Sequence, residues 1–166
     1  MRTRSVIEVF REVTRKKQAL SNEVCVSILK QELRGVLSVI GDDGYPYGMP
    51  MNHWYNEEDG RLYFHSGMSG HKVDAMKQCA KASFCVMDKG IRAEDDWALN
   101  FQSVIVFGRL EIVEDPDRAI EMIRALSNHF TDDSSYVEHE IQQAAKRTLC
   151  FCLIPEHMTG KRVNEK

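Results

Sequence analysis

The chain has 166 residues, of which 43% are hydrophobic and 28% are charged, and its formal net charge is −3. This length suits one domain with a genuine hydrophobic core, and the composition is close to that of average folded proteins. The small negative charge provides no general attraction for nucleic acid or for an anionic membrane surface, so we expect neither as a partner. An anionic ligand would have to be held by a local group of residues.

The N-terminal stretch MRTRSVIEVFREVTRKKQAL carries charges throughout and lacks the apolar segment of a signal peptide. No apolar run reaches membrane-spanning length, so we expect a cytoplasmic protein whose five cysteines are reduced thiols. A zinc site that uses these cysteines with His65 or His71 is an alternative. Because no pair of ligands has the usual zinc spacing, we predict no metal.

Residues 1–34 predict a helical lead before the first strand. Ser21 or Asn22 is a candidate N-cap, and Gly35 is a candidate stop for the helix. The apolar residues of this stretch share one helical face: Val24, Ile28, Leu29 and Leu33. The pattern is typical of an amphipathic helix.

Three β-rich runs follow, at residues 36–40, 45–55 and 61–65, and turn-forming sequences separate them. We expect an antiparallel meander. The middle run contains Pro46 and Pro50 on the same face. Because proline cannot donate to a strand ladder, this strand should lie at an edge, carry a bulge, or approach a ligand.

The rest of the chain alternates between helical and β patterns. A short helix in GHKVDAMKQCA leads into a strand at 82–88, a charged loop at 89–96 and a long strand at 101–114, where Gly108 predicts a bend. Asp115-Pro116 opens a helix, a more polar helix covers 135–146, and the last strand is 148–154 before a tail at 155–166. We therefore predict a single, mainly β domain: an antiparallel β-barrel over 35–154 with flanking helices.

The sequence HSGMSGHK stands where a predicted strand meets a predicted helix. Free N–H groups at the start of a helix favour an anion, and Lys72 would add a positive charge beside His71. Ser66 and Ser69 can donate hydrogen bonds, while the glycines allow a close backbone approach. A phosphate site and a simple turn with an N-cap are both open at this point.

Several linked motifs occur in a characteristic order: GVLSVIGDDGYPYGMPMNHWY, LYFHSGMSGHKVDAM, FCVMD, FQSVIVFGRLEIVED and TGKR. With these motifs the chain resembles the 5-nitroimidazole-resistance (Nim) proteins of the pyridoxamine 5′-phosphate oxidase-like, FMN-binding split-barrel superfamily. The resemblance covers residues 34–115 and 148–163. It implies a six-stranded Greek-key split barrel that forms a homodimer, with FMN in a groove lined by both subunits.

The resemblance also implies the residues that bind FMN: Pro50, Met51, Asn52, His65, Ser66, His71, Lys72, Gln102, Ser103 and Lys161. The segment 50–52 would run along the isoalloxazine ring, and the residues from 65 to 72 would surround the phosphate and ribityl chain. Many family members have tyrosine where this chain has Phe101, and Trp97 is a candidate to compensate for the lost hydroxyl.

The implied function is an NAD(P)H-dependent, FMN-containing reductase of small nitroaromatic or related acceptors, with His71 as a catalytic proton donor. The sequence has no Gly-rich dinucleotide motif, so the nicotinamide nucleotide would dock only transiently. Two alternatives are a flavin-binding module without turnover and a split barrel that uses F420 or haem. Oxidation of pyridoxamine phosphate is the least expected activity, because the basic residues that bind pyridoxal phosphate have no match here.

Overall fold

The structure is a computed structural model, and it describes residues 10–92 and 94–163. The helices are α1 (Asn22–Gln31), α2 (His71–Gln78), α3 (Pro116–Asn128) and α4 (Ser134–Ala144). The strands are β1 (Arg34–Ile40), β2 (Pro46–Asn52), β3 (Trp54–Asn56), β4 (Arg61–Gly67), β5 (Lys81–Met87), β6 (Phe101–Ile112) and β7 (Thr148–Val163). Short 3-10 helices cover Lys16–Gln18, Asp42–Gly44 and Ala145–Arg147.

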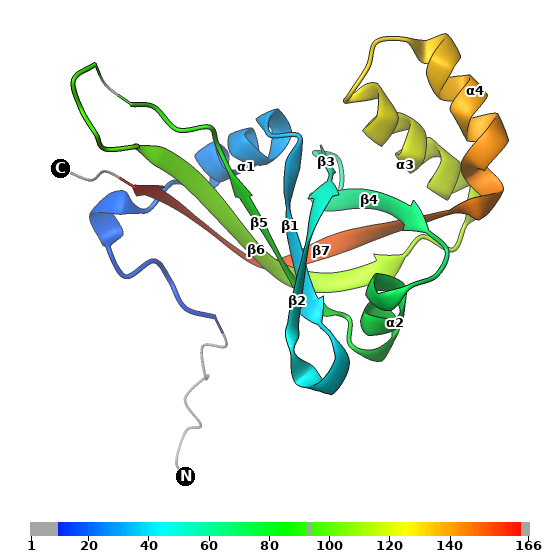
Figure 1. Cartoon of the computed structure of the whole chain (residues 1–166), viewed down its shortest axis with the longest axis horizontal. Helices are drawn as coiled ribbons and strands as arrows, with labels where there is room; N and C mark the ends of the chain where they lie inside the picture. Colours follow the sequence, from blue (N-terminus) through cyan, green and yellow to red (C-terminus); the bar gives the residue numbers. More distant parts are fainter. Residues whose placement is uncertain (1–9, 93, 164–166) are drawn as a thin grey trace.

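All seven described strands form one antiparallel sheet in the order β2-β1-β5-β6-β7-β4-β3 (Figure 1). The two edge strands, β2 and β3, are consecutive in the chain and are separated only by His53. The sheet is therefore curled so strongly that one continuous segment, β2 and β3 with the bend at His53, forms both of its edges. If β2 and β3 are counted as one strand, the barrel has six strands, and the predicted mainly β split barrel with flanking helices is confirmed.

His53 explains why the predicted run 45–55 is two strands. Its backbone N–H donates to the carbonyl of Leu33 at 3.3 Å, and its ring Nε2 lies 2.9 Å from the carbonyl oxygen of Leu29. The ring is fully buried and contacts Phe84 edge-on, with 4.8 Å between the ring centroids. Because His53 binds the end of helix α1 at Leu29 and the segment after it at Leu33, this residue leaves the strand ladder. Burial lowers the pKa of His53 to about 4.

Strand β2 alternates between the interior and the exterior as predicted. Met49 and Met51 are buried, whereas Pro46 and Pro50 are exposed opposite Ile40 and Val36 of strand β1. Within the described residues β2 pairs with β1 alone, so the prolines lie on an edge strand. An edge position is one of the three alternatives predicted from the two prolines. Proline has no N–H group to donate to a neighbouring strand, and an edge strand tolerates this because one of its sides has no neighbour.

The barrel interior is filled by apolar side chains from most strands and is closed by helices α1 and α2. Its largest fully buried residues include Phe64, Phe84, Phe151, Leu29, Leu37, Leu62 and Leu153. The rings of Phe64 and Phe84 meet edge-on at 5.1 Å, and Phe64 stacks on Phe151 at 5.3 Å. These contacts join strands β4, β5 and β7 across the interior.

The last strand is longer than predicted, because β7 continues to Val163. The predicted strand stopped at 154, before Pro155. In the structure Gly108 pairs with Pro155 and Phe107 with His157, so a bulge accommodates the proline. A Cβ atom on Gly108 would lie 2.1 Å from the carbonyl oxygen of Ile154, which explains why glycine stands at the predicted bend. Residues 155–163 are therefore strand rather than tail, and 164–166 lie outside the described residues.

The predicted N-terminal helix is also shorter in the structure. Helix α1 ends at Gln31, so Leu33 lies beyond it, and Gly35 belongs to β1 rather than ending a helix. A Cβ atom on Gly35 would lie 2.6 Å from the ring of Phe84, so packing requires this glycine. Residues 1–9 of the predicted lead lie outside the described residues.

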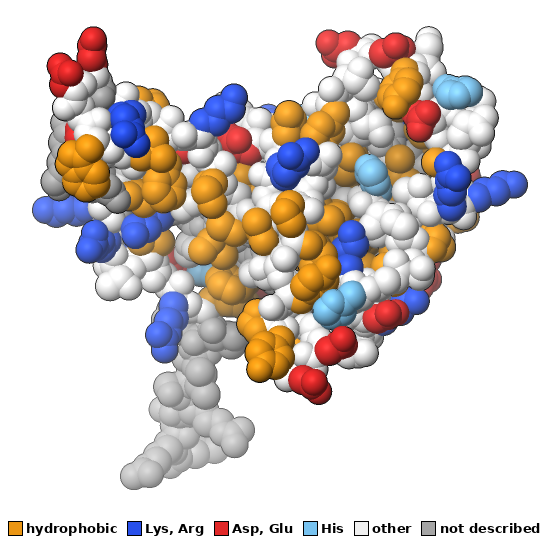
Figure 2. Space-filling view, viewed as in Figure 1, with side chains coloured by type: hydrophobic (Ala, Val, Ile, Leu, Met, Phe, Trp, Pro, Cys, Tyr) orange, Lys and Arg blue, Asp and Glu red, His pale blue; other side chains and the backbone are white. Residues whose placement is uncertain are grey.

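Helices α3 and α4 form a hairpin that covers one part of the outer sheet surface (Figure 1). Beneath it, Tyr63, Cys150 and Cys152 pack with Met122 of α3. The outer surface of β2, β1, β5, β6 and the second half of β7 has no such helical cover in the described residues. Figure 2 shows hydrophobic side chains gathered over the centre and left of the view, where Figure 1 places these strands.

Candidate functional site

The loop between β4 and α2 is open, as a ligand-binding loop requires. It runs from Gly67 to Gly70, and Gly70 has a φ of +115°, a conformation that L side chains rarely adopt. A Cβ atom built on Gly67 or Gly70 meets no atom within 4 Å. Ser66 donates its hydroxyl to the carbonyl of Gly67 at 2.9 Å, which fixes the start of the loop.

Lys72 is a partly buried cation in the first turn of α2. Its Nζ lies 3.4 Å from the Sδ atom of Met51, and a thioether is only a weak acceptor. No carboxylate of the described residues lies within ion-pair distance of Lys72. Burial lowers the pKa of Lys72. A partly desolvated ammonium without a counter-ion is a favourable site for an anion.

His65 lies on β4 close to this lysine. Partial desolvation lowers the pKa of His65, and the positive charge of Lys72 lowers it further. Both effects favour the neutral imidazole at pH 7, in which one ring nitrogen donates and the other accepts. His65 therefore offers hydrogen bonds rather than a second positive charge.

His71 contacts a different part of strand β2 from Lys72. Its ring stacks on Tyr47, with centroids 4.2 Å apart, and its Nε2 lies 3.7 Å from Oδ2 of Asp42. Lys72 instead contacts Met51, four residues farther along the strand from Tyr47. The predicted phosphate residues are thus in one region, but the side chains of His71 and Lys72 diverge.

The predicted ring-binding segment lies along the edge strand. Pro50 is exposed on the outer face, Met51 is buried in the interior, and Asn52 accepts a hydrogen bond from Nε of Arg34 at 2.8 Å. Because β2 is at the end of the sheet order, one side of its backbone has no strand partner among the described residues. A planar ligand could lie along that side and bind backbone groups.

The predicted residues on β6 and β7 lie elsewhere. Ser103 is directly opposite Lys161, and both line a hollow of about 460 Å³ together with Arg11 and Arg15. Gln102 points to the opposite face of β6 from Ser103, and its side-chain oxygen is buried without a partner in the described part of the chain. The sequence reasoning missed both arginines, since basic residues before a helix carry no distinctive pattern.

The two predicted groups are far apart within one chain. His65 pairs with Cys150 near the start of β7, whereas Ser103 pairs with Lys161, eleven residues farther along the same strand. At the usual strand rise this separation is ~35 Å along β7. The structure therefore separates Ser103 and Lys161 from His65 along β7.

Phe101, which stands where many family members have tyrosine, and Trp97, its candidate replacement, lie toward the same end of β6 as Ser103. Phe101 begins β6 and pairs with Val163, and Trp97 is 75% exposed in the β5–β6 loop. The structure brings neither of them to the Lys72 region in this chain.

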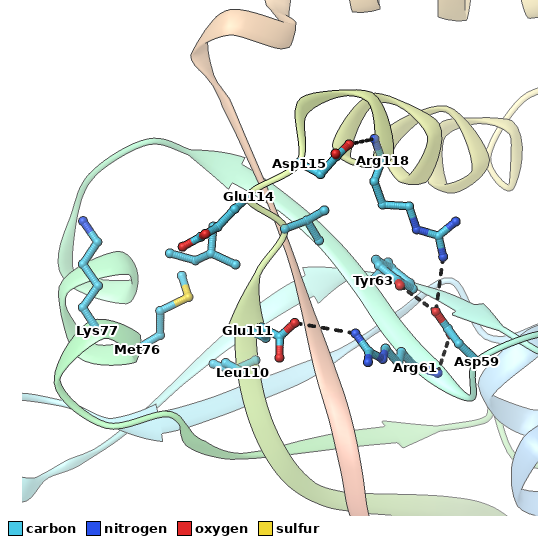
Figure 3. A pocket seen from close by; sticks show the side chains of 12 residues that line it. Asp59, Arg61, Tyr63, Met76, Lys77, Leu110, Glu111, Glu114, Asp115 and Arg118 are labelled. Atoms are coloured by element: carbon cyan, nitrogen blue, oxygen red, sulfur yellow. Dashed lines mark hydrogen bonds and ion pairs between the residues drawn. The ribbon is translucent and has the colours of Figure 1, made fainter.

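Another hollow, of about 780 Å³, lies between β4, β6 and the start of α3 and contains none of the predicted site residues (Figure 3). Its two arginines already have acidic partners. Tyr63 donates to Asp59 at 2.7 Å, Arg118 also contacts Asp59 at 3.4 Å, and Arg61 lies 3.7 Å from Glu111. This arrangement attaches helix α3 to strand β4 and its turn.

Two features are absent from the described residues, 10–92 and 94–163. No helix among them is long and apolar enough to cross a membrane. Nor do three or more histidine, cysteine, aspartate or glutamate side chains come together there in a way that could hold a metal ion.

The strand order and the helical connections define an antiparallel split barrel. The family model for pyridoxamine 5′-phosphate oxidase matches residues 21–162, and the chain belongs to this family. None of the curated proteins compared with the chain matches it.

Solved structures share the fold at low sequence identity. A proposed 5-nitroimidazole antibiotic resistance protein from Bacteroides thetaiotaomicron is 21% identical with a TM-score of 0.72, and the match covers 87% of this chain and 86% of that one. A FAD-binding protein from Mesorhizobium loti is 23% identical with a TM-score of 0.63, covering 89% and 98%. A FAD- and haem-binding protein from Mycobacterium smegmatis is 19% identical with a TM-score of 0.71, covering 90% and 74%.

Proposed function

We propose that the chain binds FMN and acts as an NAD(P)H-dependent reductase of small nitroaromatic or related acceptors. The observation that carries this proposal is Lys72, a partly buried cation without an acidic partner among the described residues, at the start of a helix. Family membership supports a flavin as the ligand, and two similar structures are FAD-binding proteins. Within this family, we also propose that the chain belongs to the 5-nitroimidazole-resistance group.

The residues around Lys72 suit the phosphate of FMN. The N–H groups of Val73 and Asp74 donate to the carbonyl of Gly70, so those of His71 and Lys72 are left for a ligand, and Gly67 and Gly70 leave open space before them. The ammonium of Lys72 would supply the charge, while Ser66 and Ser69 could donate from the loop. His65 and the free edge of β2 would then face the ribityl chain and the ring.

A second copy of the chain would complete the site. Lys161 and Ser103 lie ~35 Å along β7 from the residue that pairs with His65, so in the proposed homodimer they would reach the FMN beside His65 from the other subunit. The outer surface without helical cover supports such a homodimer, since Val36 on β1 and Ile105 on β6 are exposed there on either side of β5. Exposed apolar surface of this kind marks an interface.

Bound FMN would supply the redox chemistry by taking a hydride from the nicotinamide nucleotide and passing electrons to the acceptor. Reduction of a nitro group to a hydroxylamine consumes four electrons and four protons and releases one water. Two NAD(P)H molecules and two further protons balance it. The chain's task is to hold the flavin and to deliver protons, for which His71 is the predicted donor.

The direct test is an assay of NADH or NADPH oxidation by the FMN-loaded protein with a 5-nitroimidazole as acceptor. Acceptor-dependent oxidation supports the reductase. Tight FMN binding without turnover would favour the alternative of a flavin-binding module. A chromophore with the spectrum of F420 or haem would instead favour the third alternative.

A further inference from the structure

A separate hollow of about 380 Å³ lies between the α3–α4 hairpin and the barrel. On the barrel side it is lined by Asn52 at the end of β2 and by His65 on β4. On the hairpin side it is lined by residues of both helices, which an ion pair between Arg124 and Glu138 holds together. Its size is near the lower end of the ~300–1,000 Å³ usual for small-molecule sites.

The walls of this hollow are mainly apolar. Leu126, Val137 and Ile141 are buried at its base, and the aromatic rings of Phe130 and Tyr136 stand at its exposed rim. Such a lining favours the face of a flat ring over a flexible polar chain.

The charges of the hollow select against an anion. Its described lining contains no lysine or arginine, and the carboxylate of Glu140 stands at the rim. The lowered pKa of His65 keeps that ring neutral at pH 7. A ligand carboxylate would lose water without gaining a cation from the lining, and the nearby Lys72 is assigned to the phosphate of FMN. The polar groups of Asn52 and His65 lie together at the barrel end, where they can bind one polar substituent.

We infer that this hollow binds the acceptor as an uncharged aromatic or heteroaromatic ring, with its polar substituent directed toward Asn52 and His65. The inference rests on the proposed function, because the same two residues belong to the predicted flavin site. The two histidines occupy different places: His65 lines the hollow, whereas His71 is stacked on Tyr47. An acceptor in this hollow would therefore contact His65, and His65 rather than the predicted donor His71 would stand within hydrogen-bonding reach of it.

A matched pair of probes tests the ligand class: neutral 4-nitrobenzyl alcohol and anionic 4-nitrobenzoate. Binding is followed by methyl NMR shifts of Ile123, Leu126, Val137 and Ile141, with and without FMN. We expect the alcohol to shift these methyl groups and to bind at least ~10-fold more tightly than the carboxylate. Equal affinities, or shifts confined to other methyl groups, would overturn the inference.

Two variants and one control variant locate the site. Ala144→Leu fills the hollow and should weaken binding of the alcohol ~10-fold or more, whereas Gln143→Leu on the exposed side of α4 should leave it unchanged. Glu140→Gln removes the negative charge at the rim, so the ratio of the affinities for the alcohol and for 4-nitrobenzoate should become smaller. This variant leaves the volume of the hollow nearly unchanged. Unchanged binding in Ala144→Leu or an unchanged preference in Glu140→Gln would contradict the assignment.

The two proposals fail in different ways. If the protein does not bind FMN but the alcohol still shifts the four methyl groups, the proposed function falls and the ring-binding hollow stands. If FMN binds and the alcohol leaves these groups unshifted, the hollow is not the acceptor site, while the flavin site stands.

Discussion

The ammonium of Lys72 on helix α2 lies 3.4 Å from the thioether sulfur of Met51 on strand β2. The contact joins the helix that follows the glycine-rich loop to the edge strand predicted to lie along a flavin ring. A sulfur atom does not compensate a positive charge as a carboxylate would. The pair therefore fixes the direction of Lys72 while leaving its charge available for a ligand.

Replacing Lys72 by alanine should weaken FMN binding. Loss of a charge-assisted phosphate contact costs ~1.5–3 kcal/mol, which corresponds to a ~10- to 100-fold higher Kd. Fluorescence titration with FMN and with riboflavin measures the effect, and only FMN should lose affinity. Lys77→Ala, at an exposed position on the same helix, is the matched control. Equal losses for both flavins would show that Lys72 does not bind the phosphate.

FMN affinity should also fall at alkaline pH. The protonated form of Lys72 binds the phosphate, and burial lowers the pKa of this lysine below its usual value of 10.5. The preference for FMN over riboflavin should therefore decline at a lower pH than an ordinary lysine would predict. Lys72→Arg keeps its charge throughout this range and should flatten the decline. An identical pH profile in this variant would assign the titration to another group.

Much of the fold could be predicted from sequence because local patterns determine it. The alternation along 45–55 predicted which residues share a face of β2, and the two prolines predicted an edge position as one of three alternatives. The break at His53 could not be predicted, since it depends on hydrogen bonds to Leu29 and Leu33 on a different segment. Such tertiary contacts leave no local pattern.

His53 should make the protein less stable in acid. Its pKa is about 4 in the folded state and 6.5 for a free histidine, so the unfolded state takes up the proton first. The contribution of His53 to the free energy of unfolding is therefore complete above pH 6.5. It decreases as the pH falls toward 4, by up to about 3 kcal/mol. Urea unfolding of His53→Gln should show a smaller loss between pH 7 and 4. His139→Gln, at an exposed site, should behave like the wild type.

The attachment of the α3–α4 hairpin should depend on Tyr63. Its hydroxyl donates to Asp59, which also contacts Arg118 at the start of α3 (Figure 3). Tyr63→Phe should lower the free energy of unfolding by ~1 kcal/mol, and hydrogen exchange should increase in α3. Tyr45→Phe, at a strongly exposed tyrosine, should change neither quantity. Unchanged exchange in α3 would show that the hairpin is held by apolar packing alone.

A charge on the uncovered outer surface should disrupt the proposed homodimer. Ile105 is exposed beside Cys85 and Thr159, in the middle of this surface. Ile105→Arg should therefore give a monomer by light scattering and should also weaken FMN binding, because Lys161 and Ser103 would no longer reach the ligand. Tyr45→Arg, outside this surface, is the control. A wild-type monomer that binds FMN would contradict the shared site.

The candidate site was predictable only in part. A glycine- and serine-rich loop before a helix is a local pattern, so Lys72 and its loop could be found from sequence. The ~35 Å along β7 between Lys161 and the residue paired with His65 depends on strand register and on the bulge at Gly108, which no local pattern specifies. The hollow beside His65 likewise forms only when the α3–α4 hairpin folds over β4. From sequence, the apolar residues of the hairpin predicted only the buried face of a helix.

The most direct test of the account is the visible absorption spectrum of the purified protein after incubation with FMN and removal of free ligand, followed by mass spectrometry of the released chromophore. We predict an oxidised-flavin spectrum and the mass of FMN, both lost in Lys72→Ala. A colourless protein that fails to retain FMN would contradict the flavin site and leave only the split-barrel fold.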